Sequence, residues 1–176
     1  MNCSDEGLHK LPDGIPKSVN KINLSHNKIS AVANKMFDNL HELVVLVRRA
    51  LLVCCTVIRA EVIFQDLSYN AISTIDANGL YHLKQLKELD LTGCGLSKPQ
   101  LGQHVFAWTG SIEKLVLDKN RFQNVPNLLL MTLAKLKTVS MSDNAIERLK
   151  TSSFANLPEI ENITLNSMPT LKGTQK

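Results

Sequence analysis

Aromatic residues are scarce in this 176-residue chain, which contains one tryptophan, two tyrosines and five phenylalanines. Aliphatic side chains must therefore fill most of the core, and a hydrophobic content of 44% is sufficient for one elongated domain. An excess of one charge is also missing, because the net charge is only +4 and residues of both signs are interspersed. This pattern excludes a strongly basic surface, so we expect no nucleic-acid partner.

Catalytic and metal-binding motifs are absent as well. The five histidines share no ligand spacing, and we find no phosphate-binding glycine loop, nucleophile motif or paired carboxylates. The four cysteines include the adjacent pair Cys54 and Cys55 but no C-x-x-C spacing. We therefore predict a protein that is not an enzyme, with no catalytic residues, no metal site and no cofactor.

No apolar run reaches the length of a membrane span. The segment from Val47 to Gln65 is the apparent candidate, but its longest uncharged run is Ala50–Ile58. A transmembrane helix needs roughly 20 apolar residues. The chain also starts without the apolar region of a signal peptide. We expect no membrane insertion by this segment and no signal peptide in this chain.

The main feature that is present is an internal repeat. The stretch LKELDLTGCGL at 86–96 has the pattern L-x-x-L-x-L-x-x-N/C-x-L, and further copies begin at Val19, Ile112, Leu136 and Ile160. Periods in the twenties with this consensus are typical of leucine-rich repeats. The sequence therefore resembles a leucine-rich repeat protein. The resemblance implies an α/β fold, a horseshoe-shaped solenoid of about six repeats with a parallel β-sheet on its concave side.

The Asn or Cys of each repeat is predicted to have a structural role. Measured at this position, the period is 24 residues from Asn70 to Cys94, 26 from there to Asn120 and 24 to Asn144. A buried Asn or Cys after a strand can bond to backbone groups of the turn, and copies from successive coils then stack. The predicted ladder consists of Asn27, Asn70, Cys94, Asn120 and Asn144.

The residues between the repeated leucines form the predicted binding surface. In each L-x-L strand the leucines point into the core and the intervening residues point outward. Stacked at about 4.8 Å, these residues make a broad and mostly polar concave face, which is the surface that solenoids use for binding. The predicted partner-binding residues are Glu88, Asp90, Thr92, Lys114, Val116, Asp118, Thr138, Ser140 and Ser142.

Repeat length and the N-terminal residues resemble extracellular leucine-rich repeat proteins of the Toll-like, slit-like and adhesion-receptor type. Repeats of 24 residues with a convex Phe, such as Phe37, are the pattern of these proteins. The opening MNCSDEGLHKLPDGIP resembles the end of their cysteine-flanked N-terminal cap. We interpret residues 1–18 as a remnant of that cap and 19–176 as the solenoid, with both caps incomplete.

The resemblance implies a non-catalytic recognition module, a fragment of an extracellular or cell-surface receptor or adhesion protein that binds a protein ligand. Three N-x-S/T sequons agree with secretion and give candidate glycosylation sites at Asn2, Asn23 and Asn162. Two alternatives remain, namely an intracellular scaffold or adaptor and a non-functional product of a defective gene model. The sequence identifies neither the ligand nor the oligomeric state.

The period breaks once, between Asn27 and Asn70, which are 43 residues apart. Removal of the 19 residues 47–65 restores a 24-residue repeat, whereas the intact chain places Gln65 at a core position. We interpret 47–65 as an insertion, with a retained intron as the leading explanation and a genuine long loop as the alternative.

Overall fold

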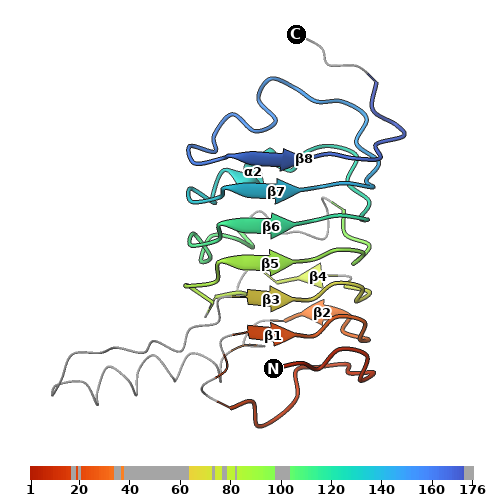
Figure 1. Ribbon diagram of the computed structural model, residues 1–176, viewed down its shortest axis with the longest axis vertical. Coiled ribbons are helices and arrows are strands. Elements are labelled where there is room, and N and C mark those ends of the chain that lie inside the picture. Colours follow the sequence, from red (N-terminus) through yellow and green to blue (C-terminus); the bar gives the residue numbers. More distant parts are fainter. Residues whose placement is uncertain are drawn as a thin grey trace, which may run out of the picture.

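The protein is described here from a computed structural model, which defines residues 1–16, 19, 21–33, 37, 64–72, 74–76, 79–81, 83–97 and 104–172 (Figure 1). One strand from each repeat joins a parallel sheet with the order β1-β3-β5-β6-β7-β8. These strands are β1 (Lys21–Asn23), β3 (Phe64–Asp66), β5 (Glu88–Asp90), β6 (Lys114–Val116), β7 (Thr138–Ser140) and β8 (Asn162–Thr164). The predicted leucine-rich repeat solenoid with a parallel sheet is confirmed.

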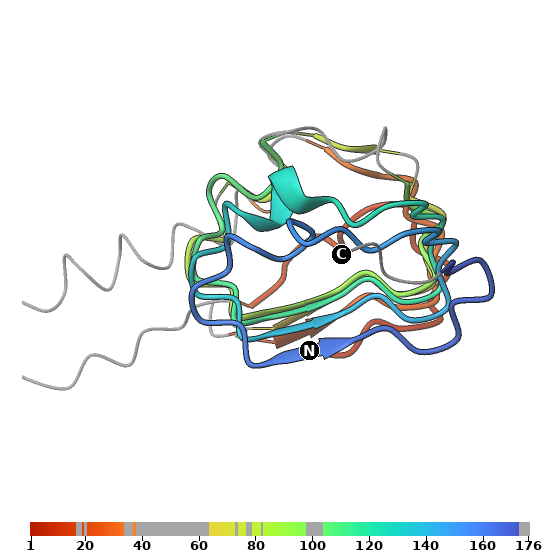
Figure 2. The same cartoon turned by 90° about the horizontal axis from the view of Figure 1, so that it is seen from above.

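On the opposite side of the stack, the described residues form mainly turns. They include the one-turn helix α2 (Asn127–Leu130), which lies across the core from the main sheet (Figure 2). The short strands β2 (Ala31–Val32) and β4 (Thr74–Ile75) form a second, two-stranded parallel sheet. Within the described ranges, no helix is both long enough and apolar enough to cross a membrane.

The core lies between the sheet and these turns. Residues at the centre of the strands, such as Leu89, Leu115 and Val139, are in register with one another and at most 1% exposed. Phe37 and Phe106 belong to turns, and each is a core residue that is 1% exposed. Each coil therefore buries its apolar residues only against its neighbours, as the repeat requires.

The two ends of the stack differ in their covering. At the first strand, the Cys3 N–H donates to the Asn23 carbonyl and the Asn23 N–H donates to the Met1 carbonyl, so residues 1–3 extend the sheet. Ile22 is fully buried as a result. Ile163, at the same register position in β8, is 42% exposed. The interpretation of residues 1–18 as a cap remnant remains a prediction.

Most of the predicted insertion, residues 47–63, lies outside the described residues. Its last two residues, Phe64 and Gln65, belong to β3. Gln65 is in register with Ile22 and Leu89, which are core residues of the neighbouring strands. A polar residue thus holds a strand position that is aliphatic in the other coils. Whether 47–65 is foreign to the repeat remains a prediction.

Candidate functional site

A buried row of side chains holds the turn that follows each strand. In Asn120, Nδ2 donates to the carbonyl oxygens of Leu91, Leu117 and Asp118 at 2.9–3.0 Å. Its Oδ1 accepts from the Leu96 N–H at 2.8 Å. The other asparagines of the predicted ladder bond in the same way, namely Asn27, Asn70 and Asn144. These amides satisfy backbone groups of two adjacent coils, so they stabilise the stack and do not form the surface.

Cys94 replaces the amide in one coil and performs only half of its role. Its Sγ approaches the Leu67 carbonyl oxygen at 3.2 Å, but it offers no amide oxygen. The Ile72 N–H, which would face that oxygen, donates instead to the Asn70 carbonyl within its own turn. Burial raises the pKa of the Cys94 thiol to about 12, so the thiol stays protonated and unreactive.

The candidate binding site is the outer face of the main sheet, which we call the sheet face. Strand pairing places Glu88, Lys114 and Thr138 in one row, and Asp90, Val116 and Ser140 in the next. These six residues, together with Thr92 and Asp118, are exposed or half-buried. The structure therefore brings eight of the nine predicted contact residues onto one surface.

Ser142 is the exception. It is only 8% exposed, because its polar groups are used between coils. Its N–H donates to Asp118 Oδ1 at 2.7 Å, and its Oγ accepts from the Asn166 N–H at 3.1 Å. Ser142 thus offers little surface to a partner, and its place among the contact residues remains a prediction.

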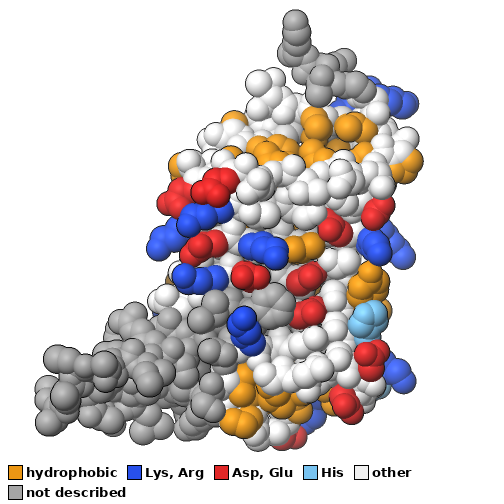
Figure 3. All heavy atoms as spheres, viewed as in Figure 1, with side chains coloured by type: hydrophobic (Ala, Val, Ile, Leu, Met, Phe, Trp, Pro, Cys, Tyr) orange, Lys and Arg blue, Asp and Glu red, His pale blue; other side chains and the backbone are white. Residues whose placement is uncertain are grey.

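Acidic side chains gather at the middle of the sheet face (Figure 3). They come from Asp66, Glu88, Asp90 and Asp118, which lie on adjacent coils. Two lysines lie on the same face. Lys114 Nζ is 3.7 Å from Glu88 Oε2, and Lys21 is exposed at the start of β1. Since both side chains of the Lys114–Glu88 pair are about half exposed, solvent screens the interaction. The centre of the face is therefore predominantly negative.

Several of these carboxylates also hold the turn after the strand, a role that the sequence analysis missed. Asp90 Oδ1 accepts from the Thr92 N–H, and Asp66 Oδ1 accepts from the Ser68 N–H, both at 2.9 Å. Such a side-chain acceptor two residues before the donor is a common turn device. The signal was visible in the sequence as Asp or Asn followed two residues later by Ser or Thr.

Asp118 performs this function for a neighbouring coil. Val116 occupies the position equivalent to Asp90 and has no acceptor. Asp118, two residues later, accepts from Ser140 Oγ at 2.6 Å and from the Ser142 N–H at 2.7 Å. The local sequence could not reveal this bond, because its partners are 22 and 24 residues away.

The same turn device accounts for two of the three sequons. Asn2 Oδ1 accepts from the N–H and Oγ of Ser4, and Asn23 Oδ1 accepts from the N–H and Oγ of Ser25. The N-x-S pattern therefore has a structural origin at both positions. Asn162 lies at the start of β8 and is exposed, so it is the sequon whose asparagine is not occupied by its own turn.

A ladder of alternating charge borders the sheet where the strands begin. The Glu113 carboxylate lies 3.2 Å from Lys87 Nζ and 3.3 Å from Lys137 Nζ. Hydrogen bonds from these two ammonium groups lower the pKa of Glu113 below its usual range. Two ammonium groups face one carboxylate, so this ladder does not add to the negative charge of the sheet face.

Among the described residues, no group of three or more His, Cys, Asp or Glu side chains is placed to hold a metal ion. Asp66, Asp90 and Asp118 bond to backbone and serine groups instead, and Glu88 pairs with Lys114. The chemistry available at this face is hydrogen bonding and charge complementarity.

Comparisons with known proteins agree with this architecture. A family model described as Leucine rich repeat matches residues 110–167. The chain thus contains leucine-rich repeats, and its solenoid has the leucine-rich repeat fold. Over 94% of its length it is 25% identical to human Leucine-rich repeats and immunoglobulin-like domains protein 3, and it spans 15% of that protein. It is 26% identical to Toll-like receptor 4 from Felis catus, again over 94% of the chain and 24% of the relative.

A solved structure gives the same fold. In the crystal structure of the TLR13–ssRNA13 complex, the matching chain superposes on 95% of this chain with a TM-score of 0.67 and 22% identity. The match covers 21% of the chain in the complex. The leucine-rich repeat solenoid thus resembles those of extracellular receptor and adhesion proteins. It spans less than a quarter of the length of these relatives.

Proposed function

We propose that this solenoid is a non-catalytic recognition module of an extracellular or cell-surface protein, and that it binds a protein ligand on the sheet face. The observation that supports this most is the charged and varied surface over β5, β6 and β7. There Glu88, Asp90 and Asp118 are half-buried and surrounded by threonine and serine side chains. Fixed carboxylates on a rigid sheet favour a partner that presents cationic side chains.

RNA is the competing ligand class, because the matched crystal structure contains single-stranded RNA. Binding of RNA depends on cations that neutralise phosphates. The middle of the sheet face offers Lys114, which already pairs with Glu88, against several carboxylates. This balance repels phosphate and supports a protein partner.

The proposal can be tested with an array of purified secreted and cell-surface proteins, followed by measurements on each protein that binds. The informative variant is Glu88→Gln, Asp90→Asn, Asp118→Asn, which removes three charges but keeps the side-chain acceptors of the turns. The matched control is Asp13→Asn, Glu147→Gln, Glu159→Gln, which changes the net charge equally at exposed positions outside the strands.

We expect the sheet-face variant to weaken binding about tenfold, mostly by slowing association, and the control to leave it unchanged. Equal weakening by both variants would mean that only net charge matters. Binding to single-stranded RNA that survives in the sheet-face variant would favour the competing ligand class. Either result would overturn the proposal.

A further inference from the structure

A second surface runs along the edge of the solenoid, where each strand passes into its turn. The residue before the ladder position has a left-handed backbone in successive coils, with φ of 55° at His26, 54° at Tyr69, 64° at Gly93 and 52° at Lys119. The N–H of each bonds to the carbonyl of the next coil, as from His26 to Ser68. The backbone therefore fixes these side chains one above another on the same edge.

The side chains of this edge contact one another in a defined order. The rings of His26 and Tyr69 are stacked, with centroids 4.5 Å apart and planes 9° from parallel. On the following coil, Gly93 leaves space for the Tyr69 ring, because a Cβ at Gly93 would lie 2.8 Å from a ring carbon. Lys119 Nζ donates to the Tyr69 hydroxyl at 3.1 Å. The Tyr69 side chain thus positions the Lys119 ammonium group.

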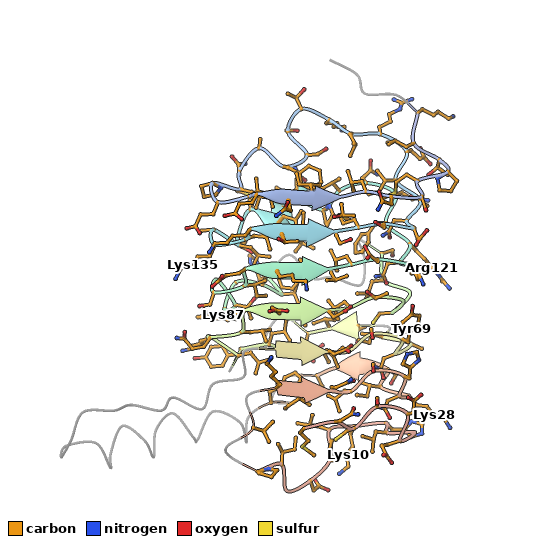
Figure 4. The ribbon with its side chains drawn as sticks, viewed as in Figure 1. Lys10, Lys28, Tyr69, Lys87, Arg121 and Lys135 are labelled. Carbon is orange, nitrogen blue, oxygen red and sulfur yellow. The ribbon has the colours of Figure 1, made fainter. Side chains whose placement is uncertain are left out.

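Further cations flank this row. Lys28 and Arg121 are exposed, each two residues beyond a member of the row, and lie on the same edge as Tyr69 (Figure 4). Among the described residues neither has an ion-pair partner. In the two coils between them, the equivalent positions hold Ala71 and Gly95. Neither residue has a side chain larger than a methyl group.

The position that holds His26, Tyr69, Gly93 and Lys119 is acidic in the segments that adjoin the row at its two ends, at Asp5 and Asp143. The four central coils therefore carry cations without intervening acids at these two positions. The hydrogen bond to Tyr69 raises the pKa of Lys119, and the nearby carboxylates of Asp143 and Asp118 raise it further.

We propose that this edge binds an extended, acidic protein segment. We call it the lateral edge and define it by His26, Lys28, Tyr69, Gly93, Lys119 and Arg121. Lys28 and Arg121 belong to coils three steps apart, which is about 14 Å at the usual strand spacing. An extended peptide covers about the same distance in four residues, so carboxylates at positions i and i+4 reach both cations.

The aromatic contacts favour an acidic peptide over a nucleic acid. Binding of single strands uses free aromatic faces on which bases stack. Here one face of the Tyr69 ring is covered by His26 and the other faces Gly93. The ring therefore serves to position Lys119, and the binding contribution of the edge is ionic.

The test uses the full chain and a fluorescein-labelled peptide of ten glutamates, with a heparin decasaccharide and a ten-nucleotide oligouridine as alternative anions. We expect the peptide to bind and to shift the backbone amide signals of Ala71, Gly93 and Gly95 in NMR spectra. Lys28→Gln with Arg121→Gln should weaken binding about tenfold. The control Lys84→Gln with Lys135→Gln removes two exposed cations that precede strands, and Lys135 lies on the opposite edge (Figure 4).

A positioning role for Tyr69 has its own readout. Tyr69→Phe keeps the stack with His26 but removes the hydroxyl that holds Lys119, so affinity for the peptide should fall about threefold while the thermal unfolding midpoint stays unchanged. Equal loss in both double variants would overturn the proposal. So would amide shifts located elsewhere, or binding of heparin or oligouridine at this edge without binding of the peptide.

Discussion

Two rows of side chains bond to the backbone along most of the sheet, one buried and one partly exposed. In the buried row, the asparagines are at most 7% exposed and each serves two coils. In the exposed row, the equivalent task is shared among Asn23, Asp66 and Asp90, and in one coil it passes to Asp118. Buried backbone groups must be satisfied, so the first row tolerates little change. Water can replace a partner in the second row, which therefore can vary and carry recognition.

The sharpest way to break this comparison is to remove one buried amide. Asn120→Ala would leave the Leu91 carbonyl oxygen and the Leu96 N–H without their partner. The Leu117 and Asp118 carbonyl oxygens would each lose one of two hydrogen bonds, because Asn144 and the Gly93 N–H still donate to them. Since each unsatisfied buried group is costly, we expect the free energy of unfolding to fall by roughly 3 kcal/mol or more. Urea denaturation monitored by circular dichroism measures this, and a loss below about 1 kcal/mol would contradict the structural role.

Cys94 offers the converse change. Cys94→Asn should restore the acceptor for the Ile72 N–H and raise the free energy of unfolding by about 1 kcal/mol at pH 7. The difference in the free energy of unfolding between the two proteins should increase at alkaline pH. The pKa of the folded thiol, about 12, lies above its ordinary value of 9.0, so the wild type is fully stable below pH 9 and loses stability as the pH rises toward 12.

The Asn variant lacks this ionisation. At pH 10 the difference between the two proteins should therefore grow by up to ~1.4 kcal/mol. Parallel stability curves from pH 8 to pH 10.5 would show that burial of the thiol has no consequence. A variant less stable than the wild type at pH 7 would show that the amide does not fit this coil.

Asp118 separates the two functions of the exposed row. Asp118→Ala removes the acceptor for Ser140 and Ser142, and we expect a loss of about 1 kcal/mol. Asp118→Asn keeps an oxygen acceptor and should lose less than half of that, while still removing the charge. If thermal melts show the same loss for both variants, the charge and not the hydrogen bond stabilises this turn.

Glycosylation at the sequons should have the smallest effect on stability, but an attached glycan increases the mass of the protein measurably. When the chain is secreted from mammalian cells behind an added signal peptide, we expect a glycan at Asn162 and little at Asn2 or Asn23. Those two side chains are engaged by Ser4 and Ser25. Intact-mass measurement before and after treatment with a glycosidase decides this, with Asn162→Gln as the control. Full occupancy at Asn23 would show that its turn opens during synthesis.

The repeated pattern was enough to predict the fold, because it records the same packing requirement in every coil. The strand registers, the buried leucines and the positions of the ladder all follow from it. Contacts that depend on a neighbouring coil could not be predicted. Examples are the hydrogen bonds that bury Ser142, the bonds that Asp118 accepts and the bond from Lys119 to Tyr69. These bonds join residues 22–50 apart in the sequence, and no local pattern specifies them.

The most direct test of recognition at the sheet face is the association rate of a protein ligand found on the array, measured by surface plasmon resonance at low and physiological salt. The variant Glu88→Gln, Asp90→Asn, Asp118→Asn should unfold at nearly the same urea concentration as the wild type yet associate about tenfold more slowly. The control Asp13→Asn, Glu147→Gln, Glu159→Gln should associate at the wild-type rate. An unchanged rate in the first variant, or an equal fall in both, would contradict the account.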